Sequence, residues 1–331
     1  MARIFLTHDR DMLENYYGER AVAALRKLGD VAVNPTGAVL TTTALIEAAR
    51  GSEIVVSDRQ TVGEAALFER SPDLVAFLRC AVDIRNIDVA AASKAGVLVT
   101  RATPGFAASV AEMGVGMMID LARHVTDSVS TYRNGAAPTA RMGRQLKGST
   151  LGIVGYGVIG QHLAKLGLAF GMTVLVSDPH KKVDELGLRQ VDLGALLRDS
   201  DFVVCLVVAL PETENLMNAA AFAAMKPTAF FINLSRGNLV DEAALEQALD
   251  EKRIAGAAMD VGRAPDQMPS LRLARRAGVI ATPHAAGLTP EAIEHQAFDT
   301  VNQVAALVAG RIPPNAVNVE HASRLGRLKK T

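Results

Sequence analysis

The sequence lacks several features that would assign it to a specialised class of protein. It has no Trp, and aromatic residues make up only 4% of its 331 residues. Only two cysteines are present, Cys80 and Cys205, and both lie in apolar stretches far apart in the chain. Two such cysteines provide neither a disulfide framework nor the ligand spacing of a metal site. We therefore expect both to be small core residues and the chemistry to proceed without a metal ion.

An excess of charge of one sign is also missing. The chain has 35 Lys and Arg residues and 35 Asp and Glu residues, so its surface has no net field to attract nucleic acid or an anionic membrane. The longest unbroken apolar run, residues 202–210, is about half the length that a bilayer crossing needs. Charged residues at positions 3, 9 and 10 interrupt any signal-like stretch. We expect a cytoplasmic protein with no nucleic-acid or membrane partner.

Short β-branched runs alternate with helix-like segments along the whole chain. A first series of strands is expected at residues 3–6, 31–33, 54–57, 74–79 and 97–100, with helices such as 19–28 and 88–95 between them. A second series is expected at residues 150–154, 174–177, 202–208, 229–233, 254–259 and 279–281. Such alternation predicts an α/β fold with two doubly wound parallel sheets, each covered by helices on both faces.

Two long helical patterns suggest how the sheets are connected. Residues 109–132 read as one interdomain helix, with Ser109 as the capping residue and Glu112 as its capping-box partner. A helix from residue 290 to about residue 309 is long enough to return to the first domain. We expect a flavodoxin-like substrate domain and a Rossmann domain, with the ligand site in the cleft between them. The expected bounds are residues 1–102 plus 289–331 for the former and 103–288 for the latter.

A glycine motif opens the second domain. Gly155-Tyr-Gly157-Val-Ile-Gly160 follows an apolar strand and begins an apolar helix, which is the context that a dinucleotide-binding motif requires. We expect Gly155 to permit the tight turn, Gly157 to let a pyrophosphate approach the backbone, and Gly160 to let the helix lie close to the strand. The amides of Val158 and Ile159 would face the phosphates at the helix N-terminus.

Asp178 ends the next expected strand, 18 residues after Gly160. A carboxylate there accepts hydrogen bonds from the ribose hydroxyls and repels a 2′-phosphate, so we expect NAD rather than NADP. Lys181 and Lys182 lie nearby and weaken that argument. The alternative, a glycine turn in a purely structural β-α unit, leaves the combination of strand, glycines, helix and acid unexplained.

Three further expected strands end in reactive side chains. Ser235 and Arg236 follow the first of them, Asp260 follows the next, and His284 follows the third. Arg236 and His284 each lie 24 residues from Asp260, which suits successive β-α units whose strands end at one edge, where open α/β sheets bind ligands. Oxidising a 2-hydroxy acid needs a base, a cation for the carboxylate and carbonyl, and a polar partner for the nicotinamide. His284, Arg236 and Asp260 match these needs.

With these motifs, the sequence resembles the D-isomer-specific 2-hydroxyacid dehydrogenases over most of its length. The matching segments are residues 85–88, 104–105, 109–112, 146–148, 234–242, 258–261 and 282–284. The resemblance implies an oxidoreductase that transfers a hydride between NAD(H) and a small D-2-hydroxy acid or 2-oxo acid. It also implies that Arg236 polarises the substrate, that His284 exchanges the proton, and that Ser235 and Asp260 contact the cofactor. The helix from Ser109 would form much of a homodimer interface.

One departure from the family pattern concerns the partner of the catalytic histidine. The family carries a Glu five residues after the position of Asp260, where it hydrogen-bonds the histidine, and this chain has Pro265 there. If the loop contains one extra residue, Asp266 takes the place of the Glu and stabilises the charged form of His284 during the oxidation. We favour Asp266. In the alternative, Gln267 or no side chain serves, and His284 is less basic.

A second departure concerns the substrate loop, which is glycine-rich in the family and reads Cys80-Ala-Val-Asp83 here. The backbone amides around Val82 and Asp83 can still bind a carboxylate, but the charge of Asp83 disfavours large anionic substrates. Hydroxypyruvate, glyoxylate and longer 2-oxo acids are all compatible with the sequence. The other six histidines have no partner pattern, so we expect surface or satisfied residues. Arg263 stands where the family carries an acid, which is compatible with a place near the cleft, but we favour a solvated loop residue.

Two other functions compete with this interpretation. The first is another hydride-transfer enzyme on the same scaffold, such as a formate or phosphite dehydrogenase, which the altered loop at Pro265 does not exclude. The second is a binding protein that senses NAD without turnover. The retention of Arg236 and His284 argues against the second, because a pure sensor has no chemical need for them.

Overall fold

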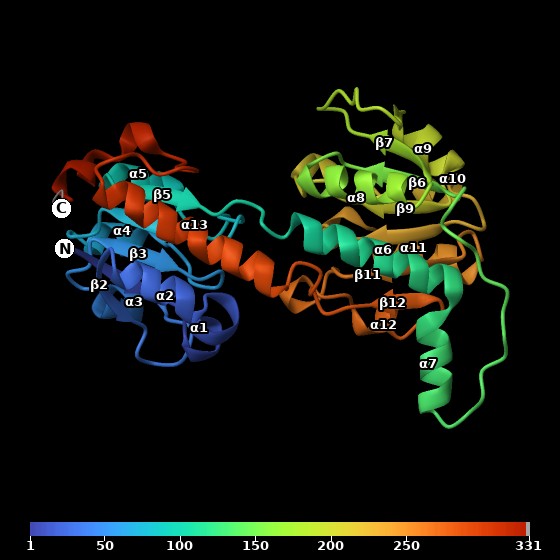
Figure 1. Ribbon diagram of the computed structural model, residues 1–331, viewed down its shortest axis with the longest axis horizontal. Coiled ribbons are helices and arrows are strands. Elements are labelled where there is room, and N and C mark those ends of the chain that lie inside the picture. The colour runs from blue at the N-terminus through green and yellow to red at the C-terminus, as the bar shows by residue number, and fades with distance from the viewer. Residues whose placement is uncertain (329–331) are drawn as a thin grey trace. The chain divides into compact units, whose positions relative to one another are not determined.

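The computed structural model describes residues 1–328, and the side chain of Asp266 lies outside that description. The chain divides into two compact units, Met1–Gly105 with Thr289–Thr331, and Phe106–Leu288. Each unit is built on its own parallel sheet (Figure 1). The first crossing between them falls after Gly105 and not after residue 102. Thr103 stays with the first unit because its amide and hydroxyl both donate to the carboxylate of Asp299.

The first unit contains a five-stranded sheet of order β2-β1-β3-β4-β5, the order found in flavodoxin-like folds. Its strands are β1 (Ala2–Leu6), β2 (Gly29–Val33), β3 (Ile54–Ser57), β4 (Ala76–Arg79) and β5 (Leu98–Arg101). Successive side chains enter opposite apolar layers: Ile4 and Leu6 belong to one cluster, and Phe5 belongs to the other. Both faces of the sheet are therefore buried, as a parallel sheet requires.

Helices cover both faces of this sheet. The layer that contains Ile4 is completed by α2 (Glu19–Arg26) and α13 (Pro290–Val308), and the opposite layer by α3 (Thr42–Ala48), α4 (Ala65–Arg70) and α5 (Val89–Ala95). A short helix, α1 (Arg10–Tyr16), follows β1. The side chains of Asp9, Thr41, Asp88 and Thr289 each cap the helix that follows them, which explains where these helices begin.

The second unit contains a seven-stranded parallel sheet of order β12-β11-β10-β9-β6-β7-β8. Its strands are β6 (Thr150–Val154), β7 (Thr173–Ser177), β8 (Leu188–Gln190), β9 (Phe202–Cys205), β10 (Phe230–Asn233), β11 (Gly256–Met259) and β12 (Val279–Ala281). The strand order reverses at β6, as in a Rossmann fold. The expected doubly wound α/β fold is therefore confirmed for both sheets. The short edge strand β8 was not expected.

Two helical layers cover the second sheet. One contains α6 (Ala107–Arg123) and α8 (Val158–Ala169), and the other contains α9 (Leu193–Asp199), α10 (Ala219–Ala224) and α11 (Glu242–Asp250). A short α12 (Leu271–Ala274) precedes β12. The expected strand at 202–208 is too long by three residues. After Cys205 the chain leaves the sheet, and the carbonyl of Val207 accepts from Ser235 Oγ.

The expectation of one continuous helix over residues 109–132 is wrong. The first helix, α6, spans Ala107–Arg123, and a second helix, α7, spans Val125–Arg133; His124 between them has a φ of 56°. The break has a local cause. The carboxylate of Asp120 accepts from the amide and the hydroxyl of Thr126, at 2.8 Å and 2.5 Å, and so caps the start of α7. Ser109 lies inside α6 and does not cap it.

Both cysteines, Cys80 and Cys205, are buried free thiols, which confirms their expected place in the core. Burial raises the pKa of each thiol to about 12, so neither is poised as a nucleophile. Among residues 1–328, no helix is both long enough and apolar enough to span a bilayer.

Candidate active site

The glycine turn after β6 has the geometry that a dinucleotide requires. Gly155 has a φ of +97°, and a methyl group added to it would lie 2.8 Å from the backbone of Leu206. A methyl group on Gly160 would lie 2.5 Å from Gly155 O, so only glycine lets α8 approach the turn this closely. At Gly157 nothing lies within 4 Å of an added methyl group. The open space at Gly157 fits the approach of a pyrophosphate to the N-terminus of α8.

Asp178, directly after β7, faces the same turn. Its Oδ2 accepts from the amide of Tyr156 at 2.8 Å, and its Oδ1 accepts from the amide of His180 at 2.8 Å. A carboxylate has about four lone-pair sites, so these two bonds orient Asp178 and leave acceptor capacity for ribose hydroxyls. The ring of Tyr156 is buried, and its hydroxyl donates to Glu185. Burial and this bond raise the pKa of Tyr156, which therefore stays neutral and ties the turn to the 185–188 segment.

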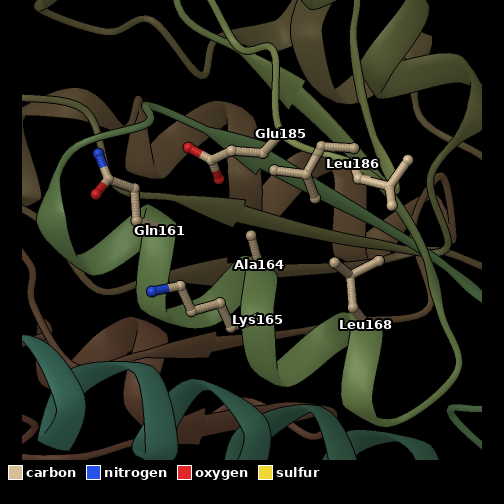
Figure 2. Close-up of a pocket in the computed structure, with 7 residues that line it drawn as sticks. Gln161, Ala164, Lys165, Leu168, Glu185 and Leu186 are labelled. Carbon is tan, nitrogen blue, oxygen red and sulfur yellow. The ribbon is translucent and has the colours of Figure 1, made fainter.

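A cavity of about 410 Å³ lies on another side of the same helix (Figure 2). Gln161, Ala164, Lys165 and Leu168 line it from α8, and Glu185, Leu186 and Leu188 line it from the segment before and within β8. None of the residues expected to bind the dinucleotide or the substrate lines this cavity.

The loop after β10 carries Arg236. The buried amide of Asn233 supports it, because Nδ2 donates to Arg236 O at 2.9 Å and Oδ1 accepts from Ser235 N at 3.1 Å. Ser235 Oγ donates to Val207 O at 2.5 Å, which links this loop to the one after β9. The guanidinium of Arg236 donates to Ser235 O at 2.7 Å and is half-buried. The backbone on both sides of Arg236 is thus fixed to the sheet edge, at Ser235 N and at Arg236 O.

Asp260 follows β11 and organises the loop that carries His284. Its buried carboxylate accepts from Thr282 Oγ1 at 2.6 Å, from Ala285 N at 2.8 Å and from Ala286 N at 3.0 Å. The carbonyl of Asp260 also accepts from His284 N at 2.9 Å. These bonds hold His284 in a left-handed conformation with a φ of 55°. The sequence argument missed this structural role of Asp260.

Arg236, Asp260 and His284 lie at the carboxyl ends of β10, β11 and β12, which are neighbours in the sheet. Asp260 N donates to Asn233 O at 3.1 Å, so the backbones of the first two loops are directly joined. The structure therefore brings these three ends to one edge of the sheet. Parallel strands end at a common edge of the sheet. The loops that follow them can therefore position side chains around one ligand.

The loop between Asp260 and β12 turns through a short 3₁₀ segment, Pro265–Gln267. Gly262 N donates to Gln267 O at 2.7 Å, and Ala264 N donates to Met268 O at 3.0 Å, which closes the loop on itself. Gln267 has a φ of 57°, and its Oε1 is buried without a hydrogen-bond partner. Because the side chain of Asp266 lies outside the described part of the chain, its expected pairing with His284 stays a prediction.

The expected substrate loop of the first unit follows β4. The carboxylate of Asp83 accepts from Arg85 Nη2 at 2.6 Å and from Arg85 Nε at 3.0 Å, and the amide of Arg85 also donates to it at 3.0 Å. Arg85 thus offsets the negative charge that the sequence argument assigned to this loop. Both side chains are well exposed, so the screening of their attraction by water is large.

Arg79, at the end of β4, is a buried structural residue that the sequence did not reveal. Its Nη1 donates to the carbonyls of Asp58 and Thr61, its Nη2 donates to Arg59 O at 2.5 Å and Asn86 Oδ1 at 2.7 Å, and its Nε donates to Asp83 O at 3.3 Å. All five guanidinium hydrogens are therefore used. Arg79 fixes the loops after β3 and β4 and has no donor left for a ligand.

His8 follows β1 and contradicts the expectation of a surface or satisfied histidine. Its ring is buried, its Nδ1 has no hydrogen-bond partner, and its centroid lies 4.7 Å from that of Tyr17. Burial lowers the pKa of His8 to about 4, against the opposing effect of Asp58. The ring is therefore neutral at physiological pH. A histidine directly after a first apolar strand was the only sequence signal, and it is weak.

Arg263 is an exposed loop residue, as we expected, but its guanidinium is engaged by neighbouring loops. It forms an ion pair with Glu214 at 2.8 Å and also donates to backbone carbonyls of the loop after β10. The sequence did not reveal these partners, because it does not show which loops meet at the edge of a sheet.

The glycine turn, the oriented acid after β7 and the three reactive strand ends define the class as a dinucleotide-binding protein of the dehydrogenase type. Comparison with known families agrees. Residues 115–286 match the model of the D-isomer specific 2-hydroxyacid dehydrogenase, NAD binding domain. The chain belongs to the D-isomer specific 2-hydroxyacid dehydrogenase family, and its second unit is the NAD-binding domain.

Named relatives share much of the chain. It is 35% identical over 285 residues to a glyoxylate reductase of Korarchaeum cryptofilum, covering 83% of this chain and 86% of that protein. It is 38% identical over 245 residues to a D-3-phosphoglycerate dehydrogenase of Synechocystis, covering 73% of this chain but only 44% of that protein. The D-lactate dehydrogenase of Aquifex aeolicus, complexed with NAD and lactic acid, has a TM-score of 0.77 at 26% identity and covers 96% of this chain and 99% of that one.

Proposed function

We propose that the chain is an NAD-dependent dehydrogenase that interconverts a small D-2-hydroxy acid and its 2-oxo acid. The observation that carries the proposal is the placement of Arg236, Asp260 and His284 on neighbouring strand ends in the unit that contains the glycine turn. Bound NAD(H) supplies or accepts the hydride at C2 of the substrate. The tasks left for the protein are to orient the substrate, to stabilise charge on its oxygens and to move one proton.

Arg236 is the group that we assign to the substrate oxygens. A guanidinium can donate two parallel hydrogen bonds to a carboxylate or bridge it to the adjacent carbonyl oxygen. In the reduction, negative charge develops on that carbonyl oxygen, so a fixed cation there lowers the barrier. The amides around Val82 and Asp83 in the first unit are our proposed second contact for the carboxylate. Ser235 and Asp260 are proposed to contact the cofactor.

His284 is the group that we assign to the proton. In the reduction, its protonated ring gives a proton to the carbonyl oxygen, and in the oxidation its neutral ring takes the proton from the hydroxyl. We propose that Asp266 pairs with His284 and favours the charged ring. The orphan acceptor on Gln267 supports the alternative that this amide fills the role. Replacing each of the two side chains separates these possibilities.

The substrate that we propose is a small 2-oxo acid such as hydroxypyruvate or glyoxylate. Relatives named glyoxylate reductase and hydroxypyruvate reductase support this choice, at 35% and 33% identity. A relative named D-3-phosphoglycerate dehydrogenase brings a phosphorylated acid into consideration. Because Arg85 offsets the charge of Asp83, the sequence argument against anionic substrates is weakened. The test panel must include such an acid.

The first experiment follows NADH oxidation with glyoxylate, hydroxypyruvate, pyruvate, longer 2-oxo acids and phosphohydroxypyruvate. We expect turnover with at least one small acid. Arg236→Ala and His284→Ala should each lower kcat/KM by about 100-fold or more, the scale of a lost charge-stabilising or acid–base group. Asp266→Asn and Gln267→Leu show which side chain assists His284. A protein that binds NADH but turns over none of these acids, nor formate or phosphite, would instead be an NAD-sensing binding protein.

We also propose that the protein is a cytoplasmic homodimer that associates through the α6 and α7 helices. Support comes from α7, in which no residue is buried. The side chains of Val125, Val129 and Tyr132 are all exposed, and their spacing places them on one face of the helix. An apolar face on an otherwise uncovered helix fits a contact with a second copy of the chain.

A further inference from the structure

Arg263 joins three loops at the carboxyl edge of the second sheet. Its Nη2 donates to Asn215 Oδ1 at 2.6 Å and to Glu214 Oε1 at 2.8 Å, both in the loop after β9. The same nitrogen lies 3.0 Å from Asn238 O, and Nε donates to Val240 O at 3.2 Å, both in the loop after β10. Arg263 itself belongs to the loop after β11. One side chain thus connects the ends of three neighbouring strands.

The turn to which Arg263 donates hydrogen bonds is the one that follows Arg236. Arg236 is extended, and the next three residues form a 3₁₀ turn, Gly237–Leu239. Asn233 fixes Arg236 to the sheet edge on both sides, through Ser235 N and Arg236 O. The far side of the turn is held by Asn215 N and Met217 N, which donate to Asn238 O and Leu239 O, and by Arg263, which donates to Asn238 O and Val240 O. Removing Arg263 would take away the side chain that joins this turn to the loop after β11.

Close contact between the two backbones makes the position of this turn sensitive to displacement of the Arg263 loop. A methyl group on Gly237 would overlap Gly262 O, so the turn after Arg236 packs directly against the residue that precedes Arg263. A methyl group on Gly262 would in turn lie 2.5 Å from the Cα of Pro269. No side chains lie between these backbones. A shift of the Arg263 loop is therefore passed directly to the Arg236 turn.

The charges around Arg263 favour a fixed geometry. Its guanidinium pairs with Glu214, whose other oxygen accepts from Asn238 Nδ2 at 2.9 Å. Its own amide donates to Glu242 Oε1 at 3.1 Å, at the start of α11. The bonds from Arg263 and Asn238 lower the pKa of Glu214, which therefore stays ionised at neutral pH. The pair is about two-fifths exposed on each side, so the network of bonds matters more than the single ion pair.

We propose that Arg263 is a positioning residue that fixes the turn carrying Arg236 and so sets the orientation in which Arg236 meets the substrate. The inference rests on the proposed function, because it assigns Arg263 to the reaction only through Arg236. Arg263 does not touch the reacting atoms. A planar guanidinium is needed because one group must reach carboxylate, amide and carbonyl acceptors from two loops, which an ammonium does not do with the same geometry.

The test compares Arg263→Met, Arg263→Lys and a matched control, Arg253→Met. Arg253 precedes β11 at the opposite edge of the sheet and pairs with the exposed Glu251, so its replacement removes a similar surface ion pair. Each protein is assayed for kcat and KM with the preferred 2-oxo acid, for NADH affinity by fluorescence, and for binding of oxamate, an unreactive analogue of 2-oxo acids. Hydrogen exchange at the amides of residues 236–240 reports the turn directly.

For Arg263→Met we expect kcat/KM to fall about 10- to 100-fold, the effect of misplacing a substrate-binding group by about 1 Å. Oxamate affinity should fall in parallel, and exchange at residues 236–240 should accelerate. NADH affinity should fall less than oxamate affinity, because the hydrogen bonds of Arg263 go to residues 214–215 and 238–240 and not to the glycine turn. Arg263→Lys should recover part of the loss, and Arg253→Met should match the wild type in every assay.

Two outcomes would overturn the proposal. In the first, Arg263→Met melts at a lower temperature but keeps wild-type kcat/KM per NADH-binding site, which is the result of a merely structural role. In the second, exchange at residues 236–240 does not change. The exchange measurement needs no turnover, so it tests the positioning role of Arg263 even if the wild type reduces no 2-oxo acid. The absence of turnover in the wild type would count against the proposed function and not against the positioning role.

Discussion

At the scale of single residues, the loop that carries His284 depends on the carboxylate of Asp260. Both of its oxygens are acceptors, for Thr282 Oγ1 and Ala285 N on one side and for Ala286 N on the other. In Asp260→Asn, one of these positions becomes an NH₂ group that faces a donor. We expect the free energy of unfolding to fall by about 1–3 kcal/mol, the cost of a buried unsatisfied group. Thermal denaturation and kcat/KM measure the effect.

The control for this prediction is Thr282→Val, which removes one side-chain donor and leaves both backbone bonds to Asp260 in place. We expect a smaller loss of stability and of kcat/KM than in Asp260→Asn. An Asp260→Asn protein with wild-type melting temperature and wild-type kcat/KM would show that the backbone holds the His284 turn without the carboxylate.

His8 predicts a pH dependence of stability. Burial lowers its pKa from 6.5 to about 4, with Asp58 and Asp9 opposing the shift and Arg79 adding to it. Between pH 6.5 and pH 4 the unfolded chain binds a proton at His8 that the folded protein does not, so stability falls as the pH falls. Over this window the loss amounts to about 3 kcal/mol at 1.36 kcal/mol per pKa unit. Chemical denaturation at several pH values measures it.

The comparison variant is His8→Gln, which keeps a polar side chain but does not titrate. Its free energy of unfolding should depend less steeply on pH between 6.5 and 4 than that of the wild type, whatever its absolute stability at neutral pH. Equal slopes for the two proteins would mean that His8 becomes protonated without cost in the folded state.

Sequence patterns located strand-end residues well but not the residues that support them. Arg236, Asp260 and His284 could be placed at one sheet edge because their spacing reflects the repeat of β-α units. The burial of Arg79 and His8 could not be predicted, because it depends on which loops meet after folding. The same holds for Arg263, whose acceptors come from loops about 25 and 50 residues earlier in the chain.

At the scale of elements, the strand–turn–helix unit at Gly155 allows two glycines to be separated by function. A methyl group at Gly157 meets nothing within 4 Å, whereas one at Gly160 lies 2.5 Å from Gly155 O. We expect Gly157→Ala to melt within about 2 °C of the wild type while its NADH affinity falls about 10-fold or more, because the methyl group would occupy the proposed path of the pyrophosphate.

Gly160→Ala should show the opposite pattern. Its stability should fall more than its NADH affinity, because α8 must move away from the turn. We expect a melting temperature lower by about 4 °C or more, the effect of 1–2 kcal/mol in a domain of this size. Calorimetry and NADH fluorescence titration compare the two variants. Loss of stability in Gly157→Ala with intact NADH affinity would contradict the assignment of the open space at Gly157 to the cofactor.

The helix after residue 106 marks the limit of pattern reading at this scale. The apolar periodicity of residues 109–132 runs on through His124, so a single helix was the natural expectation. The break depends on the Asp120 side chain, which caps α7 through Thr126. A capping carboxylate six residues before its partner has no distinct sequence signature. The strands, in contrast, were predicted to within a few residues because buried parallel strands are continuous apolar runs.

At the scale of the whole molecule, the parallel, doubly wound form of both sheets follows from the chain's own alternation. Both sheets reverse their order at an inner strand, and both place their loops of interest at the carboxyl edge. The β-α alternation and the right-handed crossover rule predict this form but not the exact order of the strands, which depends on packing. Association between copies is different, because it depends on a surface that the alternation does not describe.

That surface is the basis of the last prediction. Figure 1 shows α7 extending away from the rest of the second unit, and Val129 and Tyr132 on it are exposed by 41% and 68%. We expect the wild type to sediment as a dimer of the 35.0 kDa chain. Val129→Asp should weaken dimerisation about 100-fold or more, because an unpaired charge in an interface costs about 3 kcal/mol. Ser130→Asp, on another face of α7, is the control and should remain dimeric. A Val129→Asp protein that stays dimeric at micromolar concentration would place the contact elsewhere.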